Sequence, residues 1–240
     1  MNIVYAMTRH VYDWILPSMR SLAKTNPTAR VFVLAEDDAL PFDLPMRAEI
    51  INVTGQRYFT ENGINFNTPF KYINLLKVRY PSLLPVNKVI HLDIDTIICD
   101  SLKYLWDIDL SNRWFSACLE YNNHHYHPFG DAYYNMGVAV INLEQMRNDG
   151  IERAMQDYLN TIKQPYADQD AWNKYGIEQN KVIPFDVRFN ESAVTGYTDN
   201  PAIVHYCSIW DWYTRREGFR IEYLNKYRRC YENPDCNSNI

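Results

Sequence analysis

The stretch that decides the fold is KVIHLDIDTII, Lys88–Ile98, an apolar and largely β-branched run interrupted by two acids. Such a run is typical of a buried central strand, and its end carries Asp93 and Asp95 with one residue between them. Alternate side chains of a strand point to the same side, so the two carboxylates emerge together, about 7 Å apart while the chain stays extended. The pair predicts a ligand site where a central strand stops.

Two neighbouring carboxylates repel each other and need a compensating cation or solvent. A hard divalent metal ion that also binds phosphate oxygens meets this need. On these residues alone two interpretations stay open, a metal site or two acids in a solvated corner. The apolar strand before the pair favours the metal site, because open α/β sheets bind ligands at the carboxyl ends of their strands.

Length and composition indicate one globular domain. The chain has 240 residues, 47% of them hydrophobic, and no linker-like stretch divides it. The 19 Tyr and 6 Trp residues suit a surface that stacks on flat or sugar-like ligands, or else an aromatic core. A net charge of −5 argues against a general nucleic-acid binder.

The expected location is cytoplasmic. No apolar run reaches transmembrane length, and the first residues lack the charged start and long apolar core of a signal peptide. The five cysteines are odd in number and lack a paired metal-binding spacing, so we expect reduced thiols, with a Cys230–Cys236 pair left open.

The pattern of elements predicts an α/β fold. Apolar strands are expected at 3–6, 31–35 and 50–53, with a helix between the first two, and this order opens a parallel sheet. A helix over Ile73–Val78 is expected to stop near Pro81. Further expected elements are a short helix capped by Ser101, strands at 115–119, 135–143, 182–184 and 203–204, and helices at 144–147, at 151–162 and from the acidic turn at 168–170.

Several polar positions are ambiguous on residue type alone. The loop 120–133 carries His124, His125 and His127, for which a substrate-facing or solvated loop is favoured over a metal site. On residue type alone, the favoured interpretation of Asp168 is part of a helix N-terminus. For His205 it is a structural histidine at a strand end.

Taken in order, four blocks resemble the family 8 retaining glycosyltransferases, the group of glycogenin and of bacterial lipopolysaccharide galactosyl- and glucosyltransferases. The blocks are Leu92–Asp95 with Asp100–Leu102 and Leu105–Trp106, Asn135-x-Gly137 with Ile141–Leu143, Asp168–Asp170, and His205–Cys207. The resemblance covers residues 2–212 and implies a GT-A fold, a Rossmann-like, mixed and mostly parallel α/β sheet, with 213–240 as a C-terminal tail.

The resemblance also implies a cofactor and a donor, a UDP-sugar bound with Mn²⁺ or Mg²⁺. Asp93, Asp95 and His205 match the metal ligands, and Ile94 lies between them at the nucleotide. Manganese would act as a Lewis acid on the leaving diphosphate. The implied acceptor is a saccharide or glycolipid hydroxyl.

Three residues match positions beside the donor sugar, namely Asn135, Asp168 and Gln169. Asp168 would hydrogen-bond sugar hydroxyls, and Gln169 would lie opposite the leaving group. A carboxamide is a poor nucleophile, so departure and attack on the same face are favoured over a covalent intermediate.

The uridine side matches less closely. The family's Ala-x-Asp-x-x-Tyr becomes Ala6 followed by Thr8 and, one position late, Tyr12. Thr8 would hydrogen-bond the base, and either Tyr12 or His10 would stack on it. Lys77 matches the basic residue before the central strand.

The largest departure follows His205, where the family's Gly-x-x-Lys-Pro-Trp is replaced by residues 208–212, SIWDW. Arg215 or Arg216 is the expected substitute for the missing lysine. The tail is basic and aromatic, which suits contact with a membrane surface, but its glutamates favour a helix packed on the domain.

Two other functions compete with the transferase. A non-catalytic sugar-nucleotide or glycan-binding protein would keep the fold without the lysine. A haloacid-dehalogenase-type phosphatase also places Asp-x-Asp after an apolar strand, but it expects Thr or Val where this chain has Ile97.

Overall fold

The structure is a computed structural model, and it describes residues 1–36, 44–68, 72–121, 126–193, 196–207 and 221–232. Some of the predictions fall outside these residues. They concern Arg215, Arg216, Cys236 and the segment 208–212, where the family motif is replaced.

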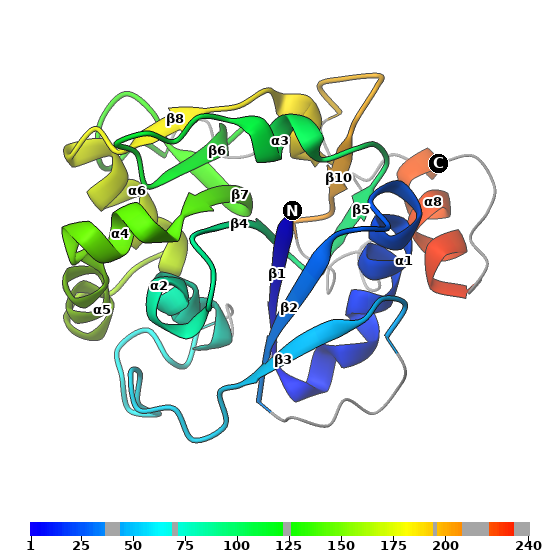
Figure 1. Ribbon diagram of the computed structural model, residues 1–240. Coiled ribbons are helices and arrows are strands. Elements are labelled where there is room, and N and C mark those ends of the chain that lie inside the picture. The colour runs from blue at the N-terminus through cyan, green and yellow to red at the C-terminus, as the bar shows by residue number, and fades with distance from the viewer. Residues whose placement is uncertain (37–43, 69–71, 122–125, 194–195, 208–220, 233–240) are drawn as a thin grey trace.

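Four parallel strands build one half of the main sheet (Figure 1), namely β1 (Asn2–Met7), β2 (Arg30–Ala35), β3 (Ala48–Asn52) and β4 (Lys88–Leu92). β1 lies between β2 and β4 and is parallel to both. These three strands are buried along almost their whole length, as expected for apolar strands covered on both faces.

The other half adds β7 (Tyr134–Asn142), which is antiparallel to both β4 and β6 (Phe115–Leu119), and β8 (Val182–Pro184), which is parallel to β6. The order of the seven strands is β3-β2-β1-β4-β7-β6-β8. The predicted α/β fold with a mixed, mostly parallel central sheet is therefore confirmed.

The decisive run 88–98 is not one strand. β4 ends at Leu92, and residues 96–98 form β5, which belongs to a second sheet with β10 (Ile203–His205) and β9 (Glu191–Ser192). The chain turns between them because the Thr96 hydroxyl donates to the Asp93 carbonyl at 2.8 Å, and β5 then pairs antiparallel with β10. The two acids therefore lie where β4 stops, as predicted, but on a turn and not on an extended chain.

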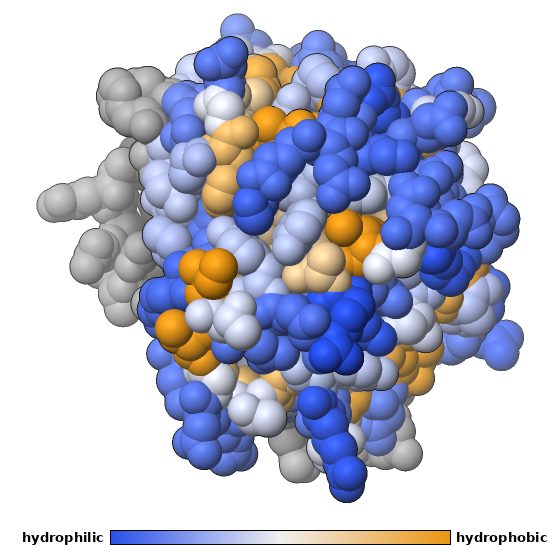
Figure 2. All heavy atoms as spheres, turned by 90° about the vertical axis from the view of Figure 1, so that its left-hand side faces the viewer, coloured by the Kyte–Doolittle hydropathy of each residue, from blue (hydrophilic) through white to orange (hydrophobic). Residues whose placement is uncertain are grey.

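Helices cover both sides of the main sheet, with α1 and α8 on one side and α2, α4, α5 and α6 on the other (Figure 1). The helical elements are η1 (Arg9–Trp14), α1 (Ile15–Thr25), η2 (Tyr72–Arg79), α2 (Tyr80–Leu83), α3 (Lys103–Asp107), α4 (Leu143–Asp149), α5 (Ile151–Thr161), α6 (Asp168–Glu178), η3 (Val187–Phe189) and α8 (Ile221–Glu232). The face seen in Figure 2 is mostly hydrophilic, with small apolar patches.

Two helix boundaries differ from the expectation. The segment before β4 is a 3-10 helix, η2, and Pro81 lies in the first turn of α2 instead of ending the helix. Proline is tolerated there because the first-turn N–H groups have no intrahelical acceptor. The N-cap residue of α3 is Leu102 and not Ser101, although the Ser101 hydroxyl accepts from the Lys103 N–H at 3.2 Å just before the helix.

The C-terminal helix α8 packs against α1. The Arg20 guanidinium donates to the Cys230 carbonyl at 2.9 Å, and the Tyr206 hydroxyl donates to the Tyr223 carbonyl. This is the packed arrangement that the glutamates of the tail favour. Of the helices in the described ranges, none combines the length and apolar character needed to cross a membrane.

Candidate active site

Two neighbouring acids and a histidine from a distant part of the chain meet at the end of β4. The His205 Nε2 atom lies 3.4 Å from Asp95 Oδ1 and 3.8 Å from Asp93 Oδ2. One ligand atom from each of the three lies within 4.8 Å of the others. No second group of three such side chains comes this close in the described parts of the chain. Two carboxylates and an imidazole form a donor set suited to Mn²⁺, so these residues fit the metal that the resemblance implies.

Asp93 is held by two donors on one of its oxygens. The Lys77 ammonium donates to Oδ1 at 2.7 Å, and His91 Nε2 lies 2.9 Å from the same atom. Burial disfavours the carboxylate, but Lys77 and the two neighbouring imidazoles outweigh burial and hold the pKa of Asp93 well below its usual range. Asp93 is therefore ionised, with Oδ2 turned toward His205.

His91 is a site residue that the sequence reasoning missed. Its ring is buried inside β4, and its Nδ1 atom lies 3.0 Å from the Tyr80 hydroxyl. Burial, together with the nearby Lys77 charge, lowers the pKa of His91 to about 4. A neutral ring that accepts from Tyr80 donates through Nε2 to Asp93. The only signal in the sequence was a histidine within an apolar strand.

Gly137 makes room for the His205 ring. A Cβ atom on Gly137 would lie 2.0 Å from His205 Cε1, so no other residue fits here without moving the ring. Gly137 thus lets the backbone of β7 approach this imidazole closely. Burial disfavours the charged ring, but Cys207 and Asp95 outweigh burial and raise the pKa of His205 well above its usual value.

A small hollow opens beside this cluster. Its lining residues are Asn74, Lys77, Asp93, Met136, Gly137, Tyr166, Asp168 and Gln169. Three of the residues predicted for the donor, Lys77, Asp168 and Gln169, therefore share one cavity with Asp93.

Asp168 is the least satisfied group of this hollow. Its side chain is buried, and its Oδ2 atom makes no hydrogen bond within the described residues; the nearest cation is Lys77 Nζ at 3.9 Å. Burial raises the pKa of Asp168 to about 7, against the attraction of Lys77. A buried carboxylate oxygen without a donor is suited to accept a hydrogen bond from a ligand hydroxyl.

The local backbone explains how Asp168 reaches the hollow. Ala167, the residue before α6, has φ 52° and ψ −123°, a conformation that costs energy for a residue with a Cβ. Asp170 closes the turn, because it accepts from the Tyr166 N–H at 2.8 Å and from the Tyr133 hydroxyl at 2.7 Å. Asp170 therefore holds the helix start, and Asp168 is left to face the cavity.

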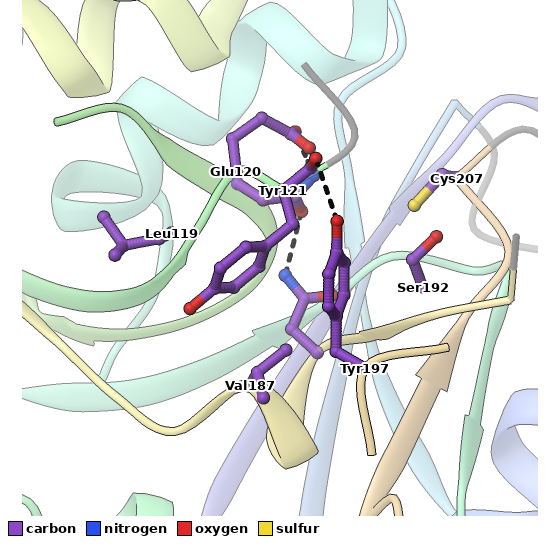
Figure 3. A pocket seen from close by; sticks show the side chains of 9 residues that line it. Leu119, Glu120, Tyr121, Val187, Ser192, Tyr197 and Cys207 are labelled. Carbon is purple, nitrogen blue, oxygen red and sulfur yellow. Dashed lines mark hydrogen bonds between the residues drawn. The ribbon is translucent and has the colours of Figure 1, made fainter. Parts of the chain in front are cut away.

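Gln169 and Asn135 are anchored by protein contacts. The Gln169 Oε1 atom accepts from the Met136 N–H at 2.9 Å. Asn135 Oδ1 accepts from the Gly137 N–H at 2.9 Å, and its amide group donates to Glu120 at 2.7 Å. Gln169 lines the hollow, whereas Asn135 lines a second, shallow one, shown in Figure 3 with Tyr121 and Tyr197 at its wall.

The residues expected at the uridine lie at the end of β1 and in η1. Ala6 and Thr8 are buried, and the Thr8 hydroxyl makes no hydrogen bond within the described chain, which leaves it available to a ligand. The Tyr12 ring is only 2% exposed and packs in the core, so stacking on a base would need the ring to be uncovered. In the histidine loop, His127 is exposed, and His124 and His125 lie outside the described residues.

The family model for glycosyl transferase family 8 matches residues 43–210, and the chain therefore belongs to glycosyltransferase family 8. A Haemophilus influenzae protein that bears the name glycosyltransferase is 28% identical over 79% of this chain. GlyB of Streptococcus pneumoniae is 22% identical over 88% of this chain. The matches span 63% and 57% of those two relatives, so the chain covers less than two thirds of their length.

Solved structures show the same fold. An active-site mutant of LgtC has a TM-score of 0.73 at 21% identity, covering 95% of this chain and 94% of that one. The galactosyltransferase LgtC in complex with donor and acceptor sugar analogues has a TM-score of 0.70 at 20% identity, with 95% of each chain covered. The fold is thus that of the GT-A glycosyltransferases. This membership removes the phosphatase interpretation of Asp-x-Asp.

Proposed function

We propose that this chain is a metal-dependent retaining glycosyltransferase that moves glucose or galactose from a UDP-sugar to a hydroxyl of a saccharide or glycolipid. The observation that carries the proposal is the meeting of Asp93, Asp95 and His205 within 4.8 Å, at the rim of a hollow that also contains Asp168 and Gln169. Family membership supports the reaction class.

Asp93 Oδ2, Asp95 and His205 Nε2 would hold Mn²⁺ or Mg²⁺. When bound, such an ion neutralises the charge that develops on the leaving UDP. Lys77 keeps Asp93 ionised and oriented through its 2.7 Å contact, and His91 does the same from the other side. These donors occupy Oδ1 and leave Oδ2 for the ion.

The hollow beside the cluster would hold the hexose. Asp168 Oδ2 would accept a hydrogen bond from a sugar hydroxyl, which supplies the donor that this buried oxygen lacks in the described chain. Gln169 would lie along the sugar with its oxygen already engaged by the Met136 N–H. An amide oxygen engaged in this way is a poor nucleophile, which supports a reaction without a covalent sugar–enzyme intermediate.

Transfer would then occur on one face of the sugar. The bond from C1 to the leaving phosphate oxygen breaks, the acceptor hydroxyl oxygen attacks C1 from the same side, and its proton passes to the leaving phosphate. The protein contributes by positioning both substrates and by excluding water. On the uridine side, Ala6, Thr8 and Tyr12 stay predictions, and so does Asn135 beside the sugar.

The test is release of UDP from UDP-glucose and UDP-galactose with and without Mn²⁺. We expect metal-dependent release, slow with water and faster with a suitable acceptor. Asp95→Asn should lower the rate at least about 100-fold, because the site loses one of its charged ligands. Asp157→Asn, an exposed acid paired with Arg153 on α5, is the matched control and should leave the rate unchanged.

Two results would count against the proposal. Equal rates for Asp95→Asn and wild type would remove the metal role of the cluster. Binding of a UDP-sugar without any release of UDP would favour the non-catalytic binding protein.

A further inference from the structure

A chain of hydrogen bonds links the candidate metal site to Glu120. Which atoms donate and which accept along it follows from two groups, one that can only donate and one that accepts. The Gly137 N–H only donates, so Asn135 Oδ1, at 2.9 Å from it, must be the oxygen. The other end of this amide lies 2.7 Å from Glu120 Oε2, an acceptor, and must be the NH₂ group. Both contacts require the same orientation of Asn135.

That orientation determines the next residue. Asn190 approaches Asn135 Oδ1 at 3.0 Å, and because that oxygen accepts, the approaching group is the Asn190 NH₂. The Asn190 Oδ1 atom therefore faces the His205 ring, 2.9 Å from Nδ1. An amide oxygen only accepts, so Nδ1 carries a proton.

We infer that Asn190 is a positioning residue that holds His205 with its Nε2 lone pair toward Asp93 and Asp95, the geometry that a metal ligand needs. In the neutral ring, a proton fixed on Nδ1 leaves Nε2 unprotonated. The inference rests on the proposed metal-dependent function. It adds Asn190 and Glu120 to the residues that the reaction depends on, and it gives the already predicted Asn135 a second role as the link between them.

The position of Asn190 suits this role. It lies directly between η3 and β9, and β9 pairs with β10, the strand that ends in His205. Both side chains are buried, at 7% exposure for Asn190 and 4% for His205, so water competes little for the hydrogen bond. Gly137 packs directly against the same ring, since a Cβ atom built there would lie 2.0 Å from His205 Cε1. Outer partners of this kind typically change metal affinity by about 10- to 100-fold.

The experiment measures Mn²⁺ affinity directly, by the electron paramagnetic resonance of unbound Mn²⁺, in the absence of any sugar nucleotide. Asn190→Leu replaces the amide with an apolar side chain that cannot accept a hydrogen bond, and the affinity should fall by about 10- to 100-fold. Asn190→Asp keeps an oxygen facing Nδ1 but places a second oxygen against Asn135, so it should lose stability and keep most of the affinity.

A matched control separates positioning from packing. Asn65 is also buried and satisfied, since it donates to the carbonyls of Leu159 and Ile162 and accepts from the Gln164 N–H. Asn65→Leu should destabilise the protein and leave Mn²⁺ affinity unchanged. A purely structural Asn190 would behave in the same way as Asn65.

A second readout does not depend on any variant folding or on a metal. Nitrogen-15 NMR of histidine-labelled wild-type protein, at a pH where the ring is neutral, should show the His205 proton on Nδ1. A proton on Nε2, or Asn190→Leu binding Mn²⁺ as tightly as wild type, overturns the inference. Wild type that binds Mn²⁺ through His205 but releases no UDP from UDP-sugars would overturn the proposed function and leave this inference standing.

Discussion

The two sides of the candidate site differ in how their polar atoms are satisfied. On the metal side, Asp93 Oδ1 accepts hydrogen bonds from Lys77 and His91, and His205 Nδ1 is hydrogen-bonded to Asn190. On the sugar side, Asp168 Oδ2 is buried and has no hydrogen bond within the described chain. The metal side is organised before any ligand arrives, whereas the sugar side carries an energetic cost that a bound ligand would relieve.

This contrast follows from what each side would bind. A metal ion needs several ligands at set distances, and outer hydrogen bonds hold those ligands in place. A sugar hydroxyl needs a free acceptor, and a protein donor in the same place would compete with it. The following variants test the contrast, in order of decreasing expected effect.

Removing the cation between the two sides should have the largest effect on stability. Lys77→Met leaves the Asp93 carboxylate without its ammonium partner at 2.7 Å and Asp168 without its cation at 3.9 Å. The free energy of unfolding at pH 7 should fall by about 3–5 kcal/mol, as for other broken buried pairs. Chemical denaturation measures the change.

Lys174→Met, which breaks the more exposed pair with Glu178, is the control and should cost less than about 1 kcal/mol. Asp168→Asn should restore part of the stability that Lys77→Met loses. Equal stability of the two lysine variants would mean that Lys77 does not hold the acids together.

Asp168→Asn alone should stabilise the ligand-free protein in a pH-dependent way. The pKa of Asp168 is raised to about 7 by burial, whereas an ordinary aspartate titrates near 3.8. Below pH 3.8 the group is protonated in both the folded and unfolded states and costs nothing. Between these values the unfolded chain ionises first, so the cost to stability grows with pH and is complete above about pH 7.

The variant should therefore equal wild type near pH 4 and exceed it by up to about 4 kcal/mol at pH 8, by thermal or chemical unfolding. It should also lose UDP release, because an amide replaces the proposed acceptor. Asp170→Asn should have the opposite effect on stability, since Asp170 accepts from Tyr133, Tyr126 and a backbone N–H. A stability gain that does not vary with pH would show that Asp168 is not a strained carboxyl.

Gly137→Ala tests how tightly the metal side is packed. The new Cβ would lie 2.0 Å from His205 Cε1, so the ring must move. We expect a loss of about 1–3 kcal/mol in the free energy of unfolding, as for other overpacked positions, together with weaker Mn²⁺ binding. If the variant binds Mn²⁺ as tightly as wild type, metal binding does not depend on the exact position of the His205 ring.

Some of the site could be predicted from the sequence because its signals are local. The Asp-x-Asp pair follows an apolar strand, and the acidic turn at 168–170 opens a helix, so both could be found by pattern alone. His205 was recognised only through the family resemblance, since a single histidine at a strand end carries no signal of its own. Lys77 was also matched through the resemblance, by counting back from Leu83-Leu84-Pro85.

The residues that support the site could not be found in this way. His91, Asn190 and Glu120 act through hydrogen bonds to residues that are distant in the sequence or on another element. The turn that carries Asp93 and Asp95 could not be predicted from the sequence either, because it depends on the pairing of β5 with β10 in a second sheet. Strand propensity alone does not distinguish one long strand from two that belong to different sheets.

The sequence by itself determined the α/β alternation, the family and the residue types of the cluster, since these depend on periodicity and on short motifs. Only the tertiary structure decided which atom of each side chain faces the ligand, which acid is satisfied and which is left buried without a donor. The physical reason is that hydrogen-bond direction and burial depend on neighbours from other strands and helices. Those neighbours are chosen when the chain packs, and no local pattern encodes them.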